Sequence, residues 1–561
     1  RPSIDRRNSM ESLERKLHLE PTHEGEYHDD HGEQGPVGVT ASTYLFAFCA
    51  ALNSCNLGYD IGVNTDAGMK IQNSMDLTDG RLEAFMGGLN LFAMIGALFS
   101  NVVSDRFGRR ASFAFASGLF IFGVLVQATA ATFEVLMFGR VFVGLGVGFG
   151  LAIDPIYISE ISPASHRGGL VTWSEIATNV GIVLGFCSGA VFYSVPEEKA
   201  WRYMFAMGGI LPTAMIFLAL FVMPESPRWL ASKGRAEEAK EVLQKVYPPH
   251  YNVDAILYEI QESIDREQEA EHATGWDVLL FPTPAFRRML LVGVGTAVSQ
   301  QIVGIDAVQY FLVFIINEAG ITGRGEQTAV LIGLGLLKLG CIFIAGWLFD
   351  TRGRRPLFFA SLFGMTIALL LLSACFYAAD LGSSGATEDG DDDNEAPGGA
   401  PGVSAPSVAV FALALYLASF SVGMGPGAWL VPSEVFSTSI RAKSMSVATF
   451  LNRSAGTVMS STLLSAANAF TWEGYFLFLA LVCLGVAGFL YLYLPETKGR
   501  SLEDMSVYFA ELTGDRSVME AEAKLRHCDG DVLSKDGTEE GTEEGTEATE
   551  ETGLVTKVSL V

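Results

Sequence analysis

Five charged residues lie inside long apolar stretches of the sequence, where a charge has no evident solvent. They are the acids Asp60, Glu175 and Asp306 and the bases Arg140 and Lys338. At the centre of a membrane each such charge costs roughly 2.5 kcal/mol or more unless it is paired or hydrated. Charges kept at that cost mark ion pathways, proton relays or substrate sites. By this count one acid has no cation, which makes it a candidate proton carrier.

The stretches around these charges are numerous and long. The chain has 561 residues, of which 49% are hydrophobic and only 18% charged, too few charges for an ordinary soluble surface. Runs of about 20 apolar residues are long enough to cross a bilayer as helices, and twelve are expected. Their ranges are 41–63, 84–104, 111–131, 134–157, 169–192, 203–223, 286–312, 326–349, 356–379, 406–431, 441–467 and 474–494.

A short signature occurs twice, as Asp105-Arg106-Phe107-Gly108-Arg109-Arg110 and as Asp350-Thr351-Arg352-Gly353-Arg354-Arg355. Each copy stands between two apolar runs, and two further motif pairs repeat in the same order. Internal duplication of membrane segments is typical of secondary transporters, with the binding site between the repeats. The predicted fold class is therefore an all-α membrane protein of two pseudo-symmetric six-helix bundles. The expected units are an N-terminal tail 1–40, a bundle 41–223, a helical linker 224–285, a bundle 286–494 with an acidic loop 380–405, and a C-terminal tail 495–561.

Lys and Arg residues cluster on one side of the predicted helices. They fill the two signature loops and the segment 228–288, which the positive-inside rule assigns to the cytoplasm. Both termini are then cytoplasmic, and the plasma membrane is favoured over an internal one. The net charge of −26 comes mainly from the tails and the acidic loop, so these read as solvated, disordered segments. A lipid bilayer is the expected environment, and nucleic acid is not an expected partner.

An enzyme is not expected. The sequence shows no nucleophile–base set and no Gly-rich phosphate loop, and its seven cysteines have no paired metal spacing. No cofactor and no metal are predicted.

The motifs together resemble the sugar porter branch of the major facilitator superfamily over roughly residues 41–510. The motifs that carry the resemblance are Gly58-Tyr59-Asp60-Ile61-Gly62, the two signature copies, Gly139-Arg140, Pro155…Glu160…Arg167-Gly168, Pro224–Arg228, Gln300-Gln301…Gly304-Ile305, Gly425-Pro426…Trp429…Glu434 and Pro495–Arg500. The resemblance implies transport by alternating access of the two bundles.

Asp60 and Arg140 are predicted to form a proton switch. Counted from the ends of their helices, they differ in depth by only about 3 Å. A closed pair keeps the aspartate ionised, whereas an open pair leaves a buried carboxylate that takes up a proton. The resemblance supports this assignment, because proton-coupled sugar porters of plants place an aspartate and an arginine at these motif positions. The alternative is a static ion pair that fixes the first bundle.

The other three buried charges indicate a branch of the family. Glu175, Asp306 and Lys338 stand where hexose carriers usually have neutral amides, and this sequence resembles the polyol/monosaccharide transporters of plants there. Carboxylates and an ammonium bind a row of hydroxyls more strongly than amides do. The depths of these residues, counted along their predicted helices, leave open whether Lys338 pairs with Glu175 or with Asp306. Asp154, near the cytoplasmic end of its helix, is expected to be exposed to water.

Four further residues are predicted to contact the substrate. Gln300, Gln301 and Asn452 offer amide groups to hydroxyls, and Trp429 offers an apolar face. The alternative for each is an interhelical hydrogen bond or packing.

A second set of residues is predicted to form a conformational latch on the cytoplasmic side. Acids and arginines there can bridge neighbouring helices while the outside is open and must part when the bundles rock the other way. Anchoring to phospholipid headgroups is the alternative. The set is Asp105, Arg109, Arg110, Glu160, Arg167, Glu225, Asp350, Arg354, Arg355, Glu434, Arg441 and Glu496.

The functional hypothesis from sequence is a proton-coupled transporter of polyols or monosaccharides. A proton-independent hexose facilitator is the first alternative, and a membrane sensor that binds sugar without transporting it is the second.

Overall fold

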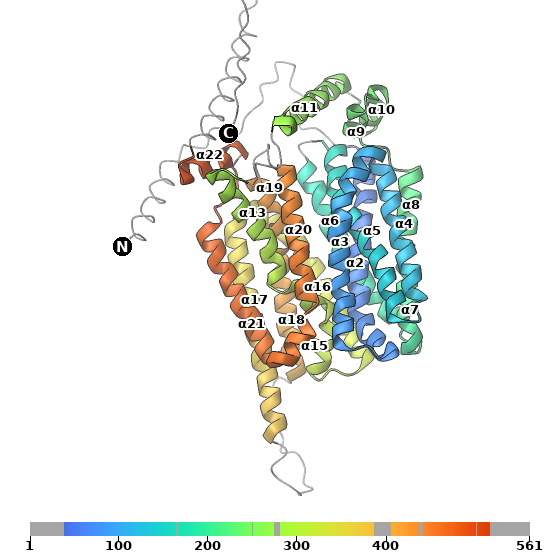
Figure 1. The fold of residues 1–561 in the computed structure, drawn as a ribbon, viewed down its shortest axis with the longest axis vertical. Coiled ribbons are helices and arrows are strands. Elements are labelled where there is room, and N and C mark those ends of the chain that lie inside the picture. Colours follow the sequence, from blue (N-terminus) through green and yellow to red (C-terminus); the bar gives the residue numbers. More distant parts are fainter. Residues whose placement is uncertain are drawn as a thin grey trace, which may run out of the picture.

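The computed structural model describes residues 39–163, 166–249, 251–273, 281–385, 405–436, 441–500 and 502–515. The elements in these ranges are helices, which form two groups side by side and a smaller group at one end (Figure 1). Each of the two large groups is formed by one half of the sequence, so we call them the first and second halves.

The first half contains seven helices among the described residues, the last two of which form one span, Glu197–Phe221. They are α2 (Ala41–Met75), α3 (Asp79–Phe107), α4 (Arg109–Ala128), α5 (Phe133–Ile161), α6 (Arg167–Val191), α7 (Glu197–Met207) and α8 (Ile210–Phe221).

The second half is more interrupted. Gly304, with a φ of +92°, separates α13 from α14, and α21 breaks at Thr471, where φ is 66°. The first turns of α21 therefore belong with α20 rather than with the last span. The helices are α13 (Pro284–Ile302), α14 (Ile305–Tyr310), α15 (Leu312–Glu318), α16 (Arg324–Arg352), α17 (Arg354–Gly385), α18 (Ala405–Val422), α19 (Met424–Val435), α20 (Arg441–Ser460) and α21 (Leu463–Tyr493).

Ten helical segments are long and apolar enough to cross a membrane by length and composition. The two expected spans missing from those ten are α2 and α20. Both are polar for a physical reason: α2 carries Asp60, Asp66 and Lys70, and α20 carries Asn452 and Arg453. Each packs against several helices of the molecule, so their polar side chains face protein rather than lipid.

Glycines allow α2 and α6 to approach closely. A Cβ at Gly58 would lie 1.8 Å from the Thr178 carbonyl oxygen, and one at Gly62 would lie 2.3 Å from that of Ile182. Small residues at a helix contact permit such backbone approach inside membranes. The contact fixes the stretch of α2 that carries Asp60.

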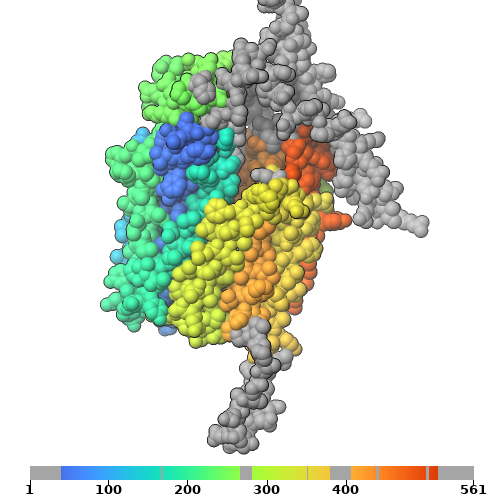
Figure 2. Space-filling model, turned by 180° about the vertical axis from the view of Figure 1, so that it is seen from behind, coloured from blue at the N-terminus to red at the C-terminus, as the bar shows by residue number. Residues whose placement is uncertain are grey.

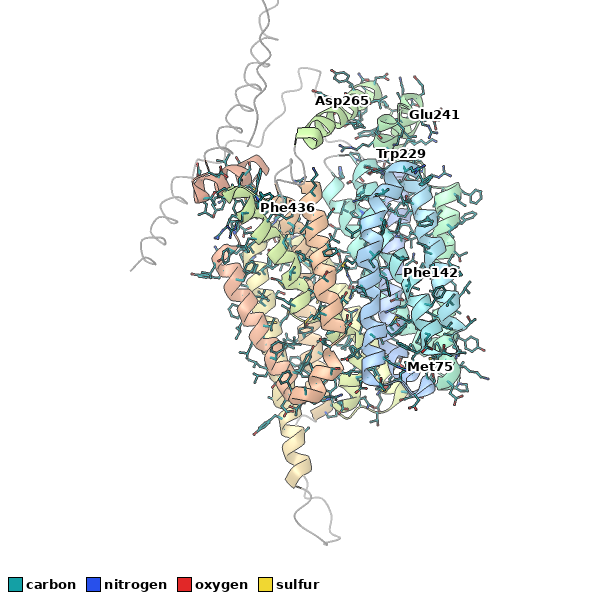
Figure 3. The ribbon with its side chains drawn as sticks, viewed as in Figure 1. Met75, Phe142, Trp229, Glu241, Asp265 and Phe436 are labelled. Atoms are coloured by element: carbon teal, nitrogen blue, oxygen red, sulfur yellow. The ribbon has the colours of Figure 1, made fainter. Side chains whose placement is uncertain are left out.

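Three short helices lie at one end of the halves: α9 (Pro227–Ser232), α10 (Ala236–Val246) and α11 (Val253–Ala273). We call this the linker end and the other the opposite end (Figure 1). Trp229, labelled in Figure 3, joins the linker helices to the first half, because its Nε1 donates to the Asp105 carbonyl at 3.0 Å.

One correction concerns the C-terminal tail, which the sequence predicted to be disordered from residue 495. Helix α22 (Leu502–Thr513) occupies part of it and packs against α13 and α19. Met505, Phe509 and Ala510 are fully buried there, and this apolar face is what holds the helix. The Asp515 carboxylate then accepts a hydrogen bond from the Ala285 amide at the start of α13.

Candidate functional site

Asp60 and Arg140 form a buried ion pair within the first half. Arg140 Nη1 lies 2.9 Å from Asp60 Oδ2 and 3.0 Å from Oδ1. The Arg140 side chain is 0% exposed. The pair links α2 to α5, so the contact predicted between Asp60 and Arg140 is present.

Arg140 is held from a third helix as well. Its Nε donates to the Phe85 carbonyl on α3 at 3.0 Å, and its guanidinium lies over the Phe85 ring at 4.5 Å. One nitrogen, Nη2, is buried without a hydrogen-bond partner. A buried donor in this state costs free energy, so the site can accept one more oxygen ligand.

The second half places amides where the first half places charges. Gln300 Nε2 donates to the Gly425 carbonyl at 2.8 Å, and its Oε1 accepts from Asn452 Nδ2 at 3.0 Å. Asn452 also donates to the Ala297 carbonyl. These bonds connect α13, α19 and α20. They are also the interhelical hydrogen bonds named above as the alternative to a role in substrate contact.

The neighbouring amide, Gln301, is in a different condition. Its Oε1 is buried and has no partner. A Cβ at Gly456 would lie 3.1 Å from that oxygen and 3.2 Å from Asn90 Nδ2. Gln301 and Asn90 therefore face the same narrow space between the halves, and an acceptor there is left for a ligand hydroxyl.

Lys338 pairs directly with neither of the two acids considered from sequence. Its Nζ donates to Gln309 Oε1 at 2.8 Å, and it lies 5.9 Å from the Phe420 ring centroid. Asp306 and Glu175 act on it electrostatically, Asp306 more strongly. Asp306 instead accepts from Asn90 Nδ2 at 2.9 Å. The depths estimated from sequence compared Lys338 only with the two acids. They did not include its actual partner, Gln309, which lies one turn from Asp306.

Two residues of this centre were missed from sequence, Asn90 and Arg453. Arg453 Nη1 donates to Asn90 Oδ1 at 3.3 Å across the two halves, and its charge acts on Glu175. Arg453 lies within the expected span 441–467, next to Asn452, so it could have been counted. With it, three acids face three bases, and the unpaired acid expected from the count of five disappears.

Trp429 lies on α19 and is half-buried. It makes no hydrogen bond, ion pair or ring contact with another described residue, so its indole remains available for packing.

Contacts between the two halves join their opposite ends. Glu83 on α3 is buried and accepts from the Ser465 amide at 2.8 Å and from its hydroxyl at 2.5 Å. Asn468 donates to Asp79 at 2.9 Å, and Arg324 pairs with Glu197 at 3.1 Å. Figure 2 shows the two halves in contact over the lower part of the molecule. The structure is closed at the opposite end.

At the linker end each half contains its own cluster. In the first, Arg109 binds Glu160 through two bonds of 2.8 and 2.9 Å and reaches Asp105 at 3.0 Å. In the second, Arg354 Nη2 lies 2.7 Å from Glu434. A carboxylate also caps the start of the next helix in both halves: Glu225 accepts from the Arg109 amide and Glu496 from the Arg354 amide. Burial raises the pKa of Glu225, which lies outside the spans.

Backbone carbonyls, rather than acids, accept the hydrogen bonds of the Arg110 and Arg355 side chains in the predicted latch. Arg110 donates to the carbonyls of Ala219 and Leu220, and Arg355 to that of Tyr491. Arg441 donates to the Ser433 carbonyl. The side chains of Arg167 and Asp350 lie outside the described residues.

The described pairs also form in a conformation in which the latch was expected to open. With a cytoplasmic linker end, closure at the opposite end should part them. In this structure each of the described arginines Arg109 and Arg354 pairs with acids of its own half, and the latch stays a prediction.

The expectation for Asp154 was wrong. Its side chain is 0% exposed. Asn53 Nδ2 donates to its Oδ1 at 2.9 Å, and the Ser54 hydroxyl donates to Oδ2. Position near a helix end did not expose it, because α2 covers this face of α5.

The fold and the charged centre between two helical halves define a multi-span membrane transporter. A family model described as "Sugar (and other) transporter" matches residues 46–509. The chain belongs to this sugar transporter family, the sugar porters of the major facilitator superfamily, as its motifs predicted.

Individual relatives agree with the family. "Probable polyol transporter 4" of Arabidopsis thaliana is 37% identical over 463 residues, covering 82% of this chain and 84% of the relative. "Polyol transporter 5" of the same plant is 33% identical over 484 residues, covering 84% and 87%. Both relatives are transporters and not enzymes by name.

Solved structures match the whole fold. The proton:xylose symporter XylE bound to 6-bromo-6-deoxy-D-glucose has a TM-score of 0.67 at 26% identity, covering 84% of this chain and 100% of that chain. The inward open conformation of XylE from E. coli has a TM-score of 0.68 at 25% identity, covering 83% and 99%. The all-α, two-bundle membrane fold predicted from sequence is thereby confirmed.

Proposed function

We propose that this protein moves polyols or monosaccharides across the membrane by alternating access, coupled to proton symport. The observation that carries the proposal is the centre shared by the two halves. Asp306, Lys338 and Arg453 lie beside amides with unused polar atoms, Gln301 Oε1 and Gln309 Nε2. Hydroxyl groups are both donors and acceptors, and they could satisfy these atoms together.

Charges at this centre favour a polyol over a pyranose. An open-chain polyol presents a flexible row of hydroxyls, and hydrogen bonds to charged groups are about twice as strong as neutral ones. Relatives named as polyol transporters support the same substrate class.

Proton coupling is assigned to Asp60 and Arg140. The pair is closed in this structure, and the Arg140 charge favours the ionised form of Asp60. Separation of α2 from α5 would leave the Asp60 carboxylate without its cation. Taking up a proton would then cost less free energy than keeping the charge in the membrane. XylE, a proton symporter of similar fold, supports the assignment.

Orientation and location complete the proposal. The linker end carries the arginine-rich loops and would be cytoplasmic, together with both termini. The plasma membrane is the proposed location.

The test is uptake of labelled mannitol, sorbitol, inositol and glucose at two external pH values, in cells lacking their own carriers. Polyol uptake that increases at acid pH and brings protons with it is expected. Glucose uptake with no proton current would instead establish the facilitator, and binding without any uptake would establish the sensor.

A further inference from the structure

Asp154 is a buried carboxylate with only neutral partners. Asn53 and Ser54 supply its hydrogen bonds, both from α2. An ionised carboxylate in the membrane interior needs a cation or several donors to offset its lost hydration. Asp154 has hydrogen-bond donors but no cation, so its surroundings hold its charge less firmly than an ion pair would.

Charged groups on the surrounding helices are engaged elsewhere. Helix α5 packs against α2, α3, α4, α6 and α9, and the described side chains that bind Asp154 are the neutral Asn53 and Ser54. Asp60 faces Arg140, Glu160 faces Arg109, and Glu175 faces Lys338 and Arg453. Glu83 faces Ser465 in the other half. The thiols on α2, Cys49 and Cys55, are buried and free.

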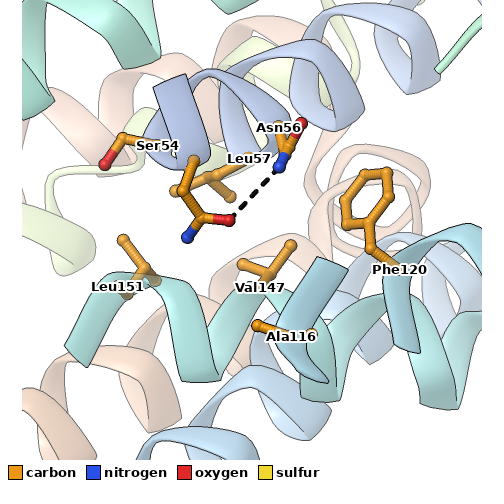
Figure 4. A pocket seen from close by; sticks show the side chains of 9 residues that line it. Ser54, Asn56, Leu57, Ala116, Phe120, Val147 and Leu151 are labelled. Atoms are coloured by element: carbon orange, nitrogen blue, oxygen red, sulfur yellow. Dashed lines mark hydrogen bonds between the residues drawn. The ribbon is translucent and has the colours of Figure 1, made fainter. Parts of the chain in front are cut away.

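A small cavity of about 10 Å³ lies beside Asn53 and Ser54, the two side-chain partners of Asp154 (Figure 4). Its lining includes Asn53, Ser54, Asn56 and Val147. Asn56 Nδ2 donates to Asn53 Oδ1 at 3.3 Å, but Asn56 Oδ1 is buried with no partner. A space of this size is about the smallest that holds one water molecule, and the unpaired oxygen offers that water an acceptor.

The cavity lies between two acids along the chain. On α2 its lining residues run from Asn53 to Leu57, on the linker side of Asp60, and on α5 they run from Gly146 to Leu151, between Arg140 and Asp154. Ser54 is six residues from Asp60, about 9 Å along the helix, and on the side of the linker end. Asp154 is therefore placed between the Asp60–Arg140 pair and the linker end.

We propose that Asp154, with Asn53, Ser54 and Asn56, forms a second proton-binding site on the linker side of the Asp60–Arg140 pair. The proposal rests on the proton coupling proposed above. When the pair closes, the Asp60 carboxyl releases its proton to water on its linker side. Water on that side passes a proton to the Asp154 carboxylate, and Asp60 is left ionised beside Arg140. The proton then leaves Asp154 towards the linker end.

Two measurements on the purified full chain test the site. In infrared spectra, one component of the protonated-carboxyl C=O band should be lost in Asp154→Asn. It should persist in Asp60→Asn and in Glu259→Gln, an exposed acid on α11 that serves as the control. In proteoliposomes, Asp154→Asn should slow proton-driven net uptake by roughly tenfold or more, because a relay group is missing. Substrate exchange at equal pH needs no net proton movement and should stay within about twofold of wild type.

The outcomes separate this inference from the proposed function. A wild-type protein that moves substrate without protons refutes the coupling itself. Coupled wild-type transport together with full proton-driven uptake in Asp154→Asn, or with no infrared component lost, overturns the second site alone. Should Asp154→Asn fail to fold, Ser54→Ala replaces it, since it removes one of the two hydrogen-bond donors. The pH at which the infrared component disappears should then change, and an unchanged pH would overturn the proposal.

Discussion

The two halves are alike at the linker end and unlike at the centre. At the linker end each half repeats one arrangement, an arginine bound to an acid of a neighbouring helix and a carboxylate that caps the helix start. At the centre the first half holds a closed ion pair without solvent contact, whereas the second half holds amides and a lysine bound to Gln309. The linker-end clusters, which hold each bundle together, have the same arrangement in both halves. Under the proposed function the two centres do different work, one binding the proton and the other the substrate, and this agrees with their different residues.

The largest expected effect comes from the centre of the first half. Asp60→Asn removes the charge that Arg140 holds, so the proposed coupling group is lost while the side chain keeps its shape. Net accumulation against a gradient should disappear, and exchange should continue. The measurement is concentrative uptake beside counterflow in the same vesicles.

The control for that variant is Asp66→Asn, another buried acid on α2, which pairs with Lys70 at 2.6 Å. It should still concentrate substrate if it reaches the membrane. If Asp60→Asn still accumulates substrate with an unchanged pH profile, the coupling site must lie elsewhere. The proposed difference between the two centres would then be contradicted.

The next effect separates the two arginines of each signature. Arg109 binds buried Glu160, and breaking a buried pair costs about 3–5 kcal/mol. Arg110 binds backbone carbonyls at the end of α8, and hydrogen bonds of this kind are worth about 1.5–3 kcal/mol. Arg109→Ala should therefore lower the thermal stability of the purified protein more than Arg110→Ala.

The second half provides the matched pair, Arg354→Ala and Arg355→Ala. The same order is expected, with a smaller loss for Arg354→Ala because Glu434 is more exposed than Glu160, 22% against 8%. Equal losses for all four variants would show that the clusters are not the stabilising units described here.

These variants also show how far the sequence could lead. Repeated motifs and apolar runs were sufficient to predict the fold class and the Asp60–Arg140 contact, because a charge within an apolar run has few possible partners. The partner of Lys338 could not be predicted, since Gln309 follows a break at Gly304 that changes the direction of the chain. The acceptors of Arg110 could not be predicted, because spacing cannot distinguish an acid from a helix-end carbonyl.

Selectivity tests the centre of the second half. The double variant Asp306→Asn, Lys338→Asn removes one acid and one base and leaves Glu175 with Arg453, so no charge is stranded. Polyol uptake should fall relative to glucose uptake, by about 1.5–3 kcal/mol for each charged hydrogen bond lost to the substrate. Competition of mannitol against glucose on wild type and variant measures this. An unchanged ratio would assign these charges to packing.

The smallest effect concerns the turn shared by both signatures. Gly108 and Gly353 have φ values of +92° and +88° with extended ψ, a region open almost only to glycine, so alanine at either costs about 1–3 kcal/mol. The surroundings differ. A Cβ at Gly108 would lie 2.3 Å from Glu225 Oε2, whereas one at Gly353 would lie 3.0 Å from Glu496 Oε2. Gly108→Ala must also displace the capping carboxylate and should lower the melting temperature more than Gly353→Ala. Gly234→Ala, at a φ of +72° with open space around it, gives the backbone cost alone. Equal decreases in melting temperature for Gly108→Ala and Gly234→Ala would mean that the Glu225 cap contributes nothing to stability. The two linker-end clusters would then share their geometry but not a stabilising role.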